Sequence, residues 1–156
     1  MSSSLNAYRI VKRRWASSAF DGEGARLYGG RWNSKGQSCV YLSSSLSLAA
    51  LEMLVHLDAE HLLSAYCAFV LPIPHSQLRQ LQPEDLPDNW REHPAPAETA
   101  RLGDAWLASG DGMALLLPSA VLPSENNLLL NTRHPAFAQC SKQAQEIPFA
   151  FDHRLK

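Results

Sequence analysis

Short apolar runs, separated by polar segments that often hold glycine or proline, predict six strands. These runs span residues 7–11, 40–42, 65–71, 113–117, 127–130 and 147–152. The second run, Val-Tyr-Leu, is rich in residues that favour pleated structure. We expect the third strand to end at Pro72. We expect the last strand, which contains Pro148, to lie at a sheet edge, because proline has no N–H for a ladder hydrogen bond.

Two further segments predict helices. Ser43-Ser-Ser45 offers N-cap side chains, and the apolar segment after it predicts a helix from residue 46 to about residue 63. A second helix opens at Glu98-Thr99 and is closed by Gly110, because glycine readily adopts the left-handed conformation that ends helices.

Two other segments favour irregular structure. Residues 22–30 contain four glycines and predict a loop, and prolines at 83, 87, 94 and 96 predict a long irregular stretch around Trp90. Long loops of this kind often serve as lids or binding elements. There is no internal repeat and no linker, and 46% of the 156 residues are hydrophobic. The chain therefore predicts one domain over residues 1–156, of the α+β class, with six or seven strands around a mixed sheet.

Charge and cysteine content exclude several function classes. The net charge of -1 argues against nucleic-acid binding by bulk charge. The three cysteines form no Cys-x-x-Cys pair, which suits core thiols in a reducing compartment. The N-terminus lacks an apolar signal core, and the longest uncharged apolar run, residues 65–73, is too short to span a bilayer. We expect a cytoplasmic protein with no membrane contact.

Familiar cofactor and metal motifs are missing. The sequence has no Gly-x-Gly-x-x-Gly after a strand, no Walker-type phosphate loop, no His-Glu-x-x-His and no Gly-x-Ser-x-Gly. The six histidines do not cluster with metal-ligand spacing. We expect neither a metal site nor a bound cofactor.

Glu52 is the residue whose surroundings call most for an explanation. It lies in an otherwise apolar helical segment, with Leu48 and Val55 among its neighbours on the helix surface. A buried charge is costly unless a cationic or hydrogen-bonding group meets it. The strongest candidate upstream is Arg31, which follows two glycines. An Arg on a glycine-rich segment and a Glu in an apolar helix indicate a site.

Other candidate residues have both a structural and a functional interpretation. Arg31 suits phosphate or carboxylate, or tethers a turn to a nearby acid. Tyr41 points opposite to its two apolar strand neighbours, and is either a site residue or a partly buried tyrosine with a satisfied hydroxyl. Ser119 and Asn131 each follow a predicted strand, and either cap turns or line a site where strand ends converge.

Taken in order, these segments resemble the RES domain. The motifs that carry the resemblance are Tyr8-Arg9-Ile10, Gly29-Gly-Arg-Trp-Asn-Ser34, Val40-Tyr-Leu-Ser43, Leu48-Ala-Ala-Leu-Glu52, Val55-His56, Trp90, Gly103-x-x-Trp-Leu107, Pro118-Ser-Ala120, Pro123-x-Glu-Asn126, Leu130-Asn131 and His134-Pro135. The resemblance covers about residues 7–152. Thr132 departs from it, because the family pattern has proline after the Asn.

The resemblance implies a toxin of a type II toxin–antitoxin pair whose fold is similar to that of ADP-ribosyltransferase toxins. The activity it implies is NAD+ phosphorolysis, with NAD+ as substrate and inorganic phosphate as co-substrate. The family's Arg, Tyr and Glu fall on Arg31, Tyr41 and Glu52. Its Ser and Asn fall on Ser119 and Asn131. Three further substrate-binding candidates lie beside Arg31, namely Tyr28, Gly30 and Trp32.

The resemblance also implies a partner, an Xre-like helix-turn-helix antitoxin that covers the active site. Residues 83–96 are a candidate antitoxin surface, and apolar strands together with Trp90 allow a homodimer. Two alternatives on the same fold change the acceptor: a protein, giving a mono-ADP-ribosyltransferase, or water, giving an NAD+ glycohydrolase. A third alternative is a non-catalytic interaction module in which an Arg31–Glu52 pair holds the domain together.

Overall fold

In the part of the chain that the structure describes, seven strands form one mixed sheet at the centre of the molecule. The computed structural model describes residues 3–58 and 65–155. The strands are β1 (Ser4–Lys12), β2 (Val40–Ser43), β3 (Tyr66–Pro74), β4 (Leu78–Gln80), β5 (Ala114–Pro118), β6 (Asn126–Leu130) and β7 (Gln145–Ile147). Their order in the sheet is β4-β5-β6-β2-β1-β3-β7. Only the β4–β5 pair is parallel.

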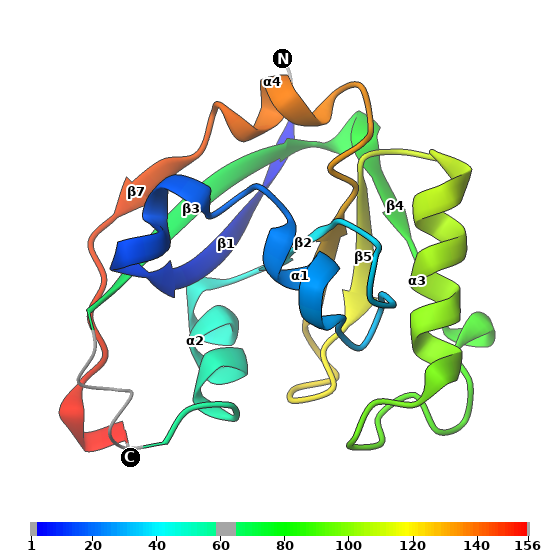
Figure 1. Cartoon of the computed structure of the whole chain (residues 1–156), viewed down its shortest axis with the longest axis horizontal. Helices are drawn as coiled ribbons and strands as arrows, with labels where there is room; N and C mark the ends of the chain where they lie inside the picture. Colours follow the sequence, from blue (N-terminus) through cyan, green and yellow to red (C-terminus); the bar gives the residue numbers. More distant parts are fainter. Residues whose placement is uncertain (1–2, 59–64, 156) are drawn as a thin grey trace.

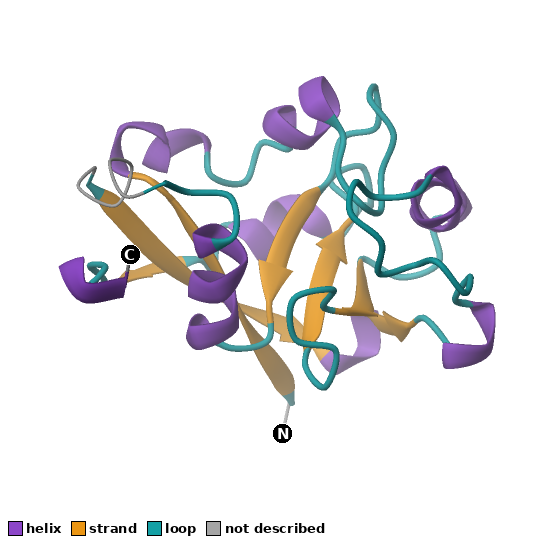
Figure 2. Ribbon diagram, turned by 90° about the horizontal axis from the view of Figure 1, so that it is seen from below, coloured by secondary structure: helices purple, strands orange, loops and turns teal. Residues whose placement is uncertain are grey.

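Helices surround this sheet. They are α1 (Glu23–Tyr28), α2 (Leu46–Leu54), α3 (Ala97–Ser109) and α4 (Phe137–Ser141), with short 3-10 helices at Arg13–Ser18, His75–Gln77, Pro83–Asp85 and His153–Leu155. In Figure 1, α2 lies below the middle of the sheet, α3 lies at the β4–β5 side, and α4 lies at the top of the view. Turned by 90°, the strands occupy the middle of the molecule and α3 is seen nearly end-on (Figure 2).

The central strands bury side chains on both faces. Val40 and Leu42 of β2 pack into one apolar cluster, together with Leu128 and Leu130 of β6. Tyr41 and Leu129 point the other way, into a second cluster. This alternation confirms that Tyr41 lies on the face opposite to its two neighbours, since successive side chains of a strand point to opposite faces.

Most of the predicted elements are confirmed. The first, second, fourth and fifth predicted strands correspond to β1, β2, β5 and β6. The helix predicted from Glu98 is α3, and Gly110 ends it with a left-handed φ of 67°. The α+β class is confirmed as well. No helix among residues 3–58 and 65–155 is long and apolar enough to cross a membrane.

The limits of three elements were predicted wrongly. β3 continues through Pro72, because β7 pairs with β3 only from Ala68 to Val70 and leaves an open edge beyond it, where proline is tolerated. α2 ends at Leu54, and residues 59–63 of the predicted helix lie outside the described residues. β7 occupies Gln145–Ile147, so the strand predicted at 147–152 shares only Ile147 with it, and Pro148, which has no N–H for a ladder hydrogen bond, lies just past its end. β7 itself lies at a sheet edge, as was expected of the last strand.

The predicted loop at 22–30 contains a helix. Gly22 and Gly29 flank α1 with φ of 77° and 71°, so these glycines begin and end the helix instead of disrupting it. The sequence also gave no indication of β4 or α4, which are only three and five residues long. Trp90, one of the features that allowed a homodimer, is half-buried, with its ring 6.4 Å from that of Trp32.

Candidate functional site

Glu52 lies on the side of α2 that faces the sheet. Ser45 caps this helix by accepting a hydrogen bond from the Leu48 N–H at 3.0 Å. Leu48 is fully buried, and Glu52, four residues later on the same helix face, is half-buried. Its Oε1 accepts hydrogen bonds from Ser119 Oγ at 2.6 Å and from Asn127 Nδ2 at 2.8 Å. The expectation that hydrogen-bonding groups meet this carboxylate is therefore confirmed.

The turn between β5 and β6 brings Ser119 to Glu52. Ser119 follows the last residue of β5 and is buried. Its N–H donates to the Glu125 carbonyl at 3.0 Å, which closes the start of the turn. Its Oγ accepts from the N–H groups of Val121 and Leu122 at 3.1 and 3.0 Å. The hydroxyl is thus fixed from the turn side and directed at the carboxylate of Glu52.

Arg31 does not pair directly with Glu52. Within the described residues the two side chains form no ion pair, and Nη1 of Arg31 instead donates to the carbonyls of Trp90 and Glu92 at 2.8 and 2.7 Å. Burial lowers the pKa of Arg31, and the negative charge of Glu52 opposes that shift. The expected Arg31–Glu52 ion pair is therefore absent, although the two charges interact across the site.

Tyr41 supports the turn that carries Arg31. Its hydroxyl accepts from the Trp32 N–H at 3.0 Å and donates to Asn33 Oδ1 at 2.6 Å. Burial raises the pKa of Tyr41 far above its ordinary value. Gly30 lies against the ring, and a Cβ there would come within 2.7 Å of the Tyr41 hydroxyl. The structure therefore shows the satisfied, buried hydroxyl of the structural interpretation.

The remaining candidates beside Arg31 occupy different environments. Trp32 is only 2% exposed and packs against Trp90, so its ring belongs to the core beneath the turn. Tyr28, the last residue of α1, is 77% exposed. Of these two aromatic rings, only that of Tyr28 is free to meet a ligand as the chain stands.

Asn131 lies apart from the other candidates. β5 and β6 are antiparallel, so the residue after β5 and the residue after β6 lie at opposite ends of the pair. Asn131 Nδ2 donates to the Leu107 carbonyl at 3.1 Å, and its Oδ1 accepts from the Arg133 N–H at 3.1 Å. The two strand ends considered above therefore do not converge.

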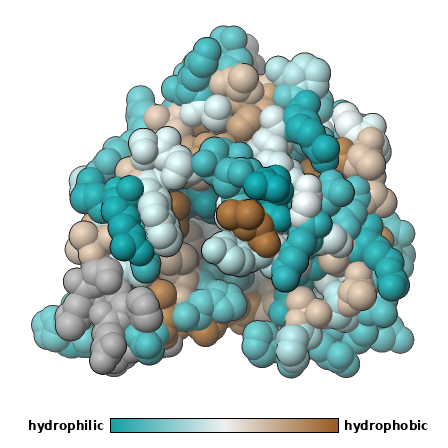
Figure 3. All heavy atoms as spheres, viewed as in Figure 1, coloured by the Kyte–Doolittle hydropathy of each residue, from teal (hydrophilic) through white to brown (hydrophobic). Residues whose placement is uncertain are grey.

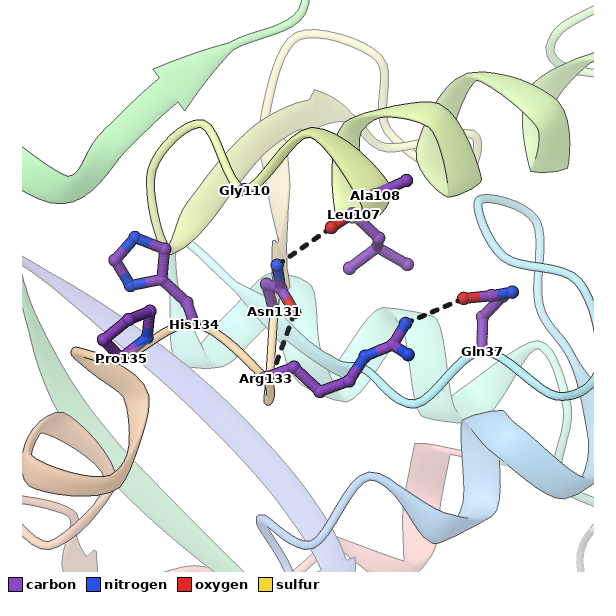
Figure 4. A pocket seen from close by; sticks show the side chains of 8 residues that line it. All are labelled: Gln37, Leu107, Ala108, Gly110, Asn131, Arg133, His134 and Pro135. Atoms are coloured by element: carbon purple, nitrogen blue, oxygen red, sulfur yellow. Dashed lines mark hydrogen bonds between the residues drawn. The ribbon is translucent and has the colours of Figure 1, made fainter.

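Asn131 lines a cavity of about 490 Å³ at that distant end (Figure 4). Figure 4 shows His134 and Pro135 on one side of it and the hydrogen-bonded pair of Arg133 and Gln37 on the other. The side-chain amide of Asn131 already has hydrogen-bond partners within the protein, and it lies at the opposite end of the β5–β6 pair from Ser119. This cavity is therefore separate from the site around Glu52.

The molecular surface is hollowed between the regions of α2 and α3 (Figure 3). In the view of Figure 1, the molecular surface recedes at its lower centre, below α1 and between the regions of α2 and α3 (Figure 3). Glu52, Ser119 and Arg31 come from the three segments that border this region: α2, the β5–β6 turn and the segment after α1. Within the described part of the chain, no three His, Cys, Asp or Glu residues are grouped so as to hold a metal ion.

Asn127 is the residue of this site that the sequence analysis missed. It stands directly across from Ser43 in the β2–β6 pairing. The available signal was the position of Asn127, a polar residue at the start of an apolar strand. The prediction chose Asn131, the residue after that strand, instead. The carbonyls that hold Arg31 were not predictable, because they belong to the irregular stretch 83–96.

The RES domain family matches residues 6–152. The chain belongs to the RES-domain family. A family member from Yersinia enterocolitica serotype O:8 / biotype 1B, named Toxin Res, is 51% identical over 96% of this chain and 98% of that toxin.

Two other comparisons extend this result. The Prs ADP-ribosylating toxin of Sphingobium sp. (strain YBL2) is 36% identical over 79% of this chain and 78% of that protein. A chain in the crystal structure of the M.tuberculosis MbcT-MbcA toxin-antitoxin complex superposes with a TM-score of 0.74, covering 99% of this chain and 88% of that chain. Its sequence identity is 20%, so this likeness concerns the fold. The α+β fold of the RES domain is thereby confirmed, and the name of the Sphingobium relative agrees with the expected likeness to ADP-ribosyltransferase toxins.

Proposed function

We propose that this RES-domain protein is the toxin of a toxin–antitoxin pair and that it depletes NAD+ by phosphorolysis. The toxin assignment is supported by the 51% identity to Toxin Res of Yersinia enterocolitica. The observation that carries the activity is the carboxylate of Glu52, held by Ser119 and Asn127 at the edge of a hollow and opposed by the cation of Arg31. Each of these groups is placed before any substrate arrives.

A carboxylate in this position would favour the cleavage of NAD+. A phosphate oxygen bonds to C1″ of the nicotinamide ribose while the C1″–N bond breaks, and the electron pair of that bond goes to the ring nitrogen. Neutral nicotinamide leaves, and ADP-ribose 1″-phosphate remains. The ribose gains positive charge in the transition state, as in glycoside hydrolysis. A fixed carboxylate in a partly buried site lowers the energy of that state.

Arg31 is suited to the attacking phosphate or to the NAD+ pyrophosphate. Only its Nη1 is engaged by the carbonyls of Trp90 and Glu92. The edge formed by Nε and Nη2 carries no hydrogen bond within the described residues, and this is the edge that grips phosphate in a bidentate way. In this proposal NAD+ is the substrate and not a resident cofactor. NAD+ and inorganic phosphate are both present in the cytoplasm, where we propose that the protein acts.

The acceptor is the part of this proposal that one experiment decides. Purified protein is incubated with NAD+, labelled in its adenylate part, with and without inorganic phosphate, and all products are identified by mass spectrometry. A phosphate-dependent small product supports phosphorolysis. Free ADP-ribose without phosphate identifies a glycohydrolase. Label on protein identifies a mono-ADP-ribosyltransferase, the alternative favoured by the name of the Sphingobium relative. Intact NAD+ in every arm identifies an interaction module and overturns the enzymatic proposal.

Glu52→Gln is expected to keep the fold and to lose NAD+ consumption. Removal of one preorganised electrostatic group typically costs about 10² to 10³ in rate. The measurement is kcat under saturating NAD+ and phosphate, with circular dichroism to verify folding. Glu84→Gln, the same change at an exposed position in the 3-10 helix Pro83–Asp85, is the matched control and should retain the wild-type rate. A folded Glu52→Gln protein with wild-type turnover would exclude the assignment.

We further propose that an Xre-like helix-turn-helix antitoxin covers the hollow beside Glu52. The fold match to a chain of a toxin–antitoxin complex supports an antitoxin partner of some kind. Expression of the chain alone should deplete host NAD+ and arrest growth, and co-expression of a small helix-turn-helix protein encoded beside it should restore both. Growth arrest without a fall in NAD+ would contradict this account.

A further inference from the structure

Asn127 contacts Glu52 but had no part in the sequence-based prediction. Resting on the NAD+-cleaving function proposed above, we propose that Asn127, oriented by Ser43, is a positioning residue that holds Oε1 of Glu52 and leaves Oε2 alone to face the substrate.

The side-chain amide of Asn127 has one favoured orientation. Ser43 Oγ donates to Asn127 Oδ1 at 2.7 Å, and Asn127 Nδ2 donates to Glu52 Oε1 at 2.8 Å. The reverse orientation would bring Oδ1 against the carboxylate oxygen, with no hydrogen between them. Ser43 is only 4% exposed and lies directly across from Asn127 in the β2–β6 pairing, so the amide is held by the sheet itself.

Ser119 is the second donor to Oε1 of Glu52. Its oxygen already accepts from the N–H groups of Val121 and Leu122, so its single hydrogen is free to be donated. That hydrogen goes to Oε1 of Glu52 at 2.6 Å. Oε1 therefore receives two donated hydrogens from two rigid neighbours.

The other carboxylate oxygen of Glu52, Oε2, is left free by these two donors. Oε2 of Glu52 has no hydrogen-bond partner within the described residues. Across that part of the chain, the hydroxyl of Tyr66 is the only enclosed side-chain polar atom without a partner, so Oε2 is not enclosed. It is thus the oxygen that remains for a ribose hydroxyl or for the positive charge at C1″. The charge of Glu52 acts on the pKa of Arg31, which makes Arg31 the cation associated with this carboxylate, and the carboxylate of Glu125 accepts from Ser45 Oγ at 3.1 Å.

Asn127→Asp tests this inference with almost no change of shape. It replaces the donating NH2 by an oxygen and places a second carboxylate against Oε1. We expect kcat to fall by about 10²-fold or more, with a much smaller change in KM for NAD+, because the loss falls on the transition state. The matched control is Asn126→Asp, the same substitution one residue earlier and on the opposite face of β6, which should keep wild-type kcat and KM.

A double-mutant cycle separates positioning from general support of the fold. Asn127→Ala is measured alone and together with Glu52→Gln, with NAD+ turnover and thermal unfolding followed for each protein. A positioning residue slows the wild type but adds no further slowing once the Glu52 carboxylate is gone. Equal slowing in both backgrounds would overturn the inference and identify a structural role.

The outcomes also distinguish this inference from the proposed function. Wild-type kcat in both folded Asn127 variants, beside an inactive Glu52→Gln protein, would overturn the role of Asn127 and leave the function standing. Wild-type turnover by Glu52→Gln would overturn the function itself, and the role of Asn127 with it.

Discussion

Tyr41 shows how one hydroxyl group fixes the geometry of the glycine-rich turn. It accepts from the Trp32 N–H and donates to Asn33 Oδ1, so the backbone at Trp32 and the side chain of Asn33 are both tied to the central strand β2. Gly30 closes over the ring, where no side chain would fit. Arg31 projects between these anchors. Tyr41 therefore helps to position Arg31 indirectly, by holding the turn that carries it.

Tyr41→Phe is expected to destabilise the protein by about 1–3 kcal/mol, because the Trp32 N–H and Asn33 Oδ1 would both lose their buried partner. For a chain of this length, each kcal/mol corresponds to roughly 2–4 °C in Tm. Urea denaturation measures the loss. Tyr28→Phe removes the same hydroxyl from a side chain that is 77% exposed and should leave the stability unchanged. Equal stability of the two variants would show that the Tyr41 hydroxyl has no structural role.

Helix α3 meets the glycine-rich turn at closer range than any side chain would allow. A Cβ on Gly103 would lie 1.6 Å from the carbonyl oxygen of Trp32, which is backbone and cannot move aside cheaply. Thr99, one turn earlier, donates to the Arg31 carbonyl at 2.7 Å. The turn therefore packs directly on the surface of α3, and this contact fixes the position of the Arg31 backbone.

Gly103→Ala should push α3 away from the turn and destabilise the protein by about 1–3 kcal/mol or more. Gly24→Ala is the matched control, since a Cβ there meets nothing within 4 Å and α1 should gain about 0.5–1 kcal/mol from the better helix former. Thermal unfolding of the two variants should therefore shift in opposite directions. A shift of the same sign in both would contradict this view of the α3 contact.

Sequence reasoning succeeded where a local pattern decides the structure. The alternation around Tyr41 and the closure of α3 at Gly110 follow from periodicity and glycine chemistry, and both are found in the structure. The strand limits at Pro72 and Pro148 depend on which neighbour pairs with which edge, which no local pattern encodes. In the site, Glu52 was indicated by its apolar surroundings. The separation of Ser119 from Asn131 depends on strand direction and stayed unpredicted.

The molecule as a whole keeps its thiols inside. Cys39, Cys67 and Cys140 are all buried and free. Burial raises the pKa of the Cys39 thiol to about 12, and the charge of Asp104 adds to that shift. In the unfolded chain the same thiol ionises at about pH 8.5. The neutral thiol therefore favours the folded state below that pH, and this contribution is lost as the pH rises toward 12.

Global stability is accordingly expected to fall between about pH 8.5 and pH 12, because the unfolded state releases the Cys39 proton first. Urea midpoints measured across this range give the slope. Cys39→Ala should have lower stability at pH 7, from the lost packing of the side chain, and a shallower alkaline slope. A variant whose stability declines as steeply as that of the parent would contradict the assignment to Cys39.

The bonds from Arg31 to the carbonyls of Trp90 and Glu92 have a mechanical consequence. Those carbonyls belong to the proline-rich segment 83–96, at positions outside helix and strand, so the side-chain cation of Arg31 is attached to that segment. A macromolecule that moved this segment from outside would also move the guanidinium, without occupying the hollow. If the proposed activity depends on Arg31, such a movement would inhibit it.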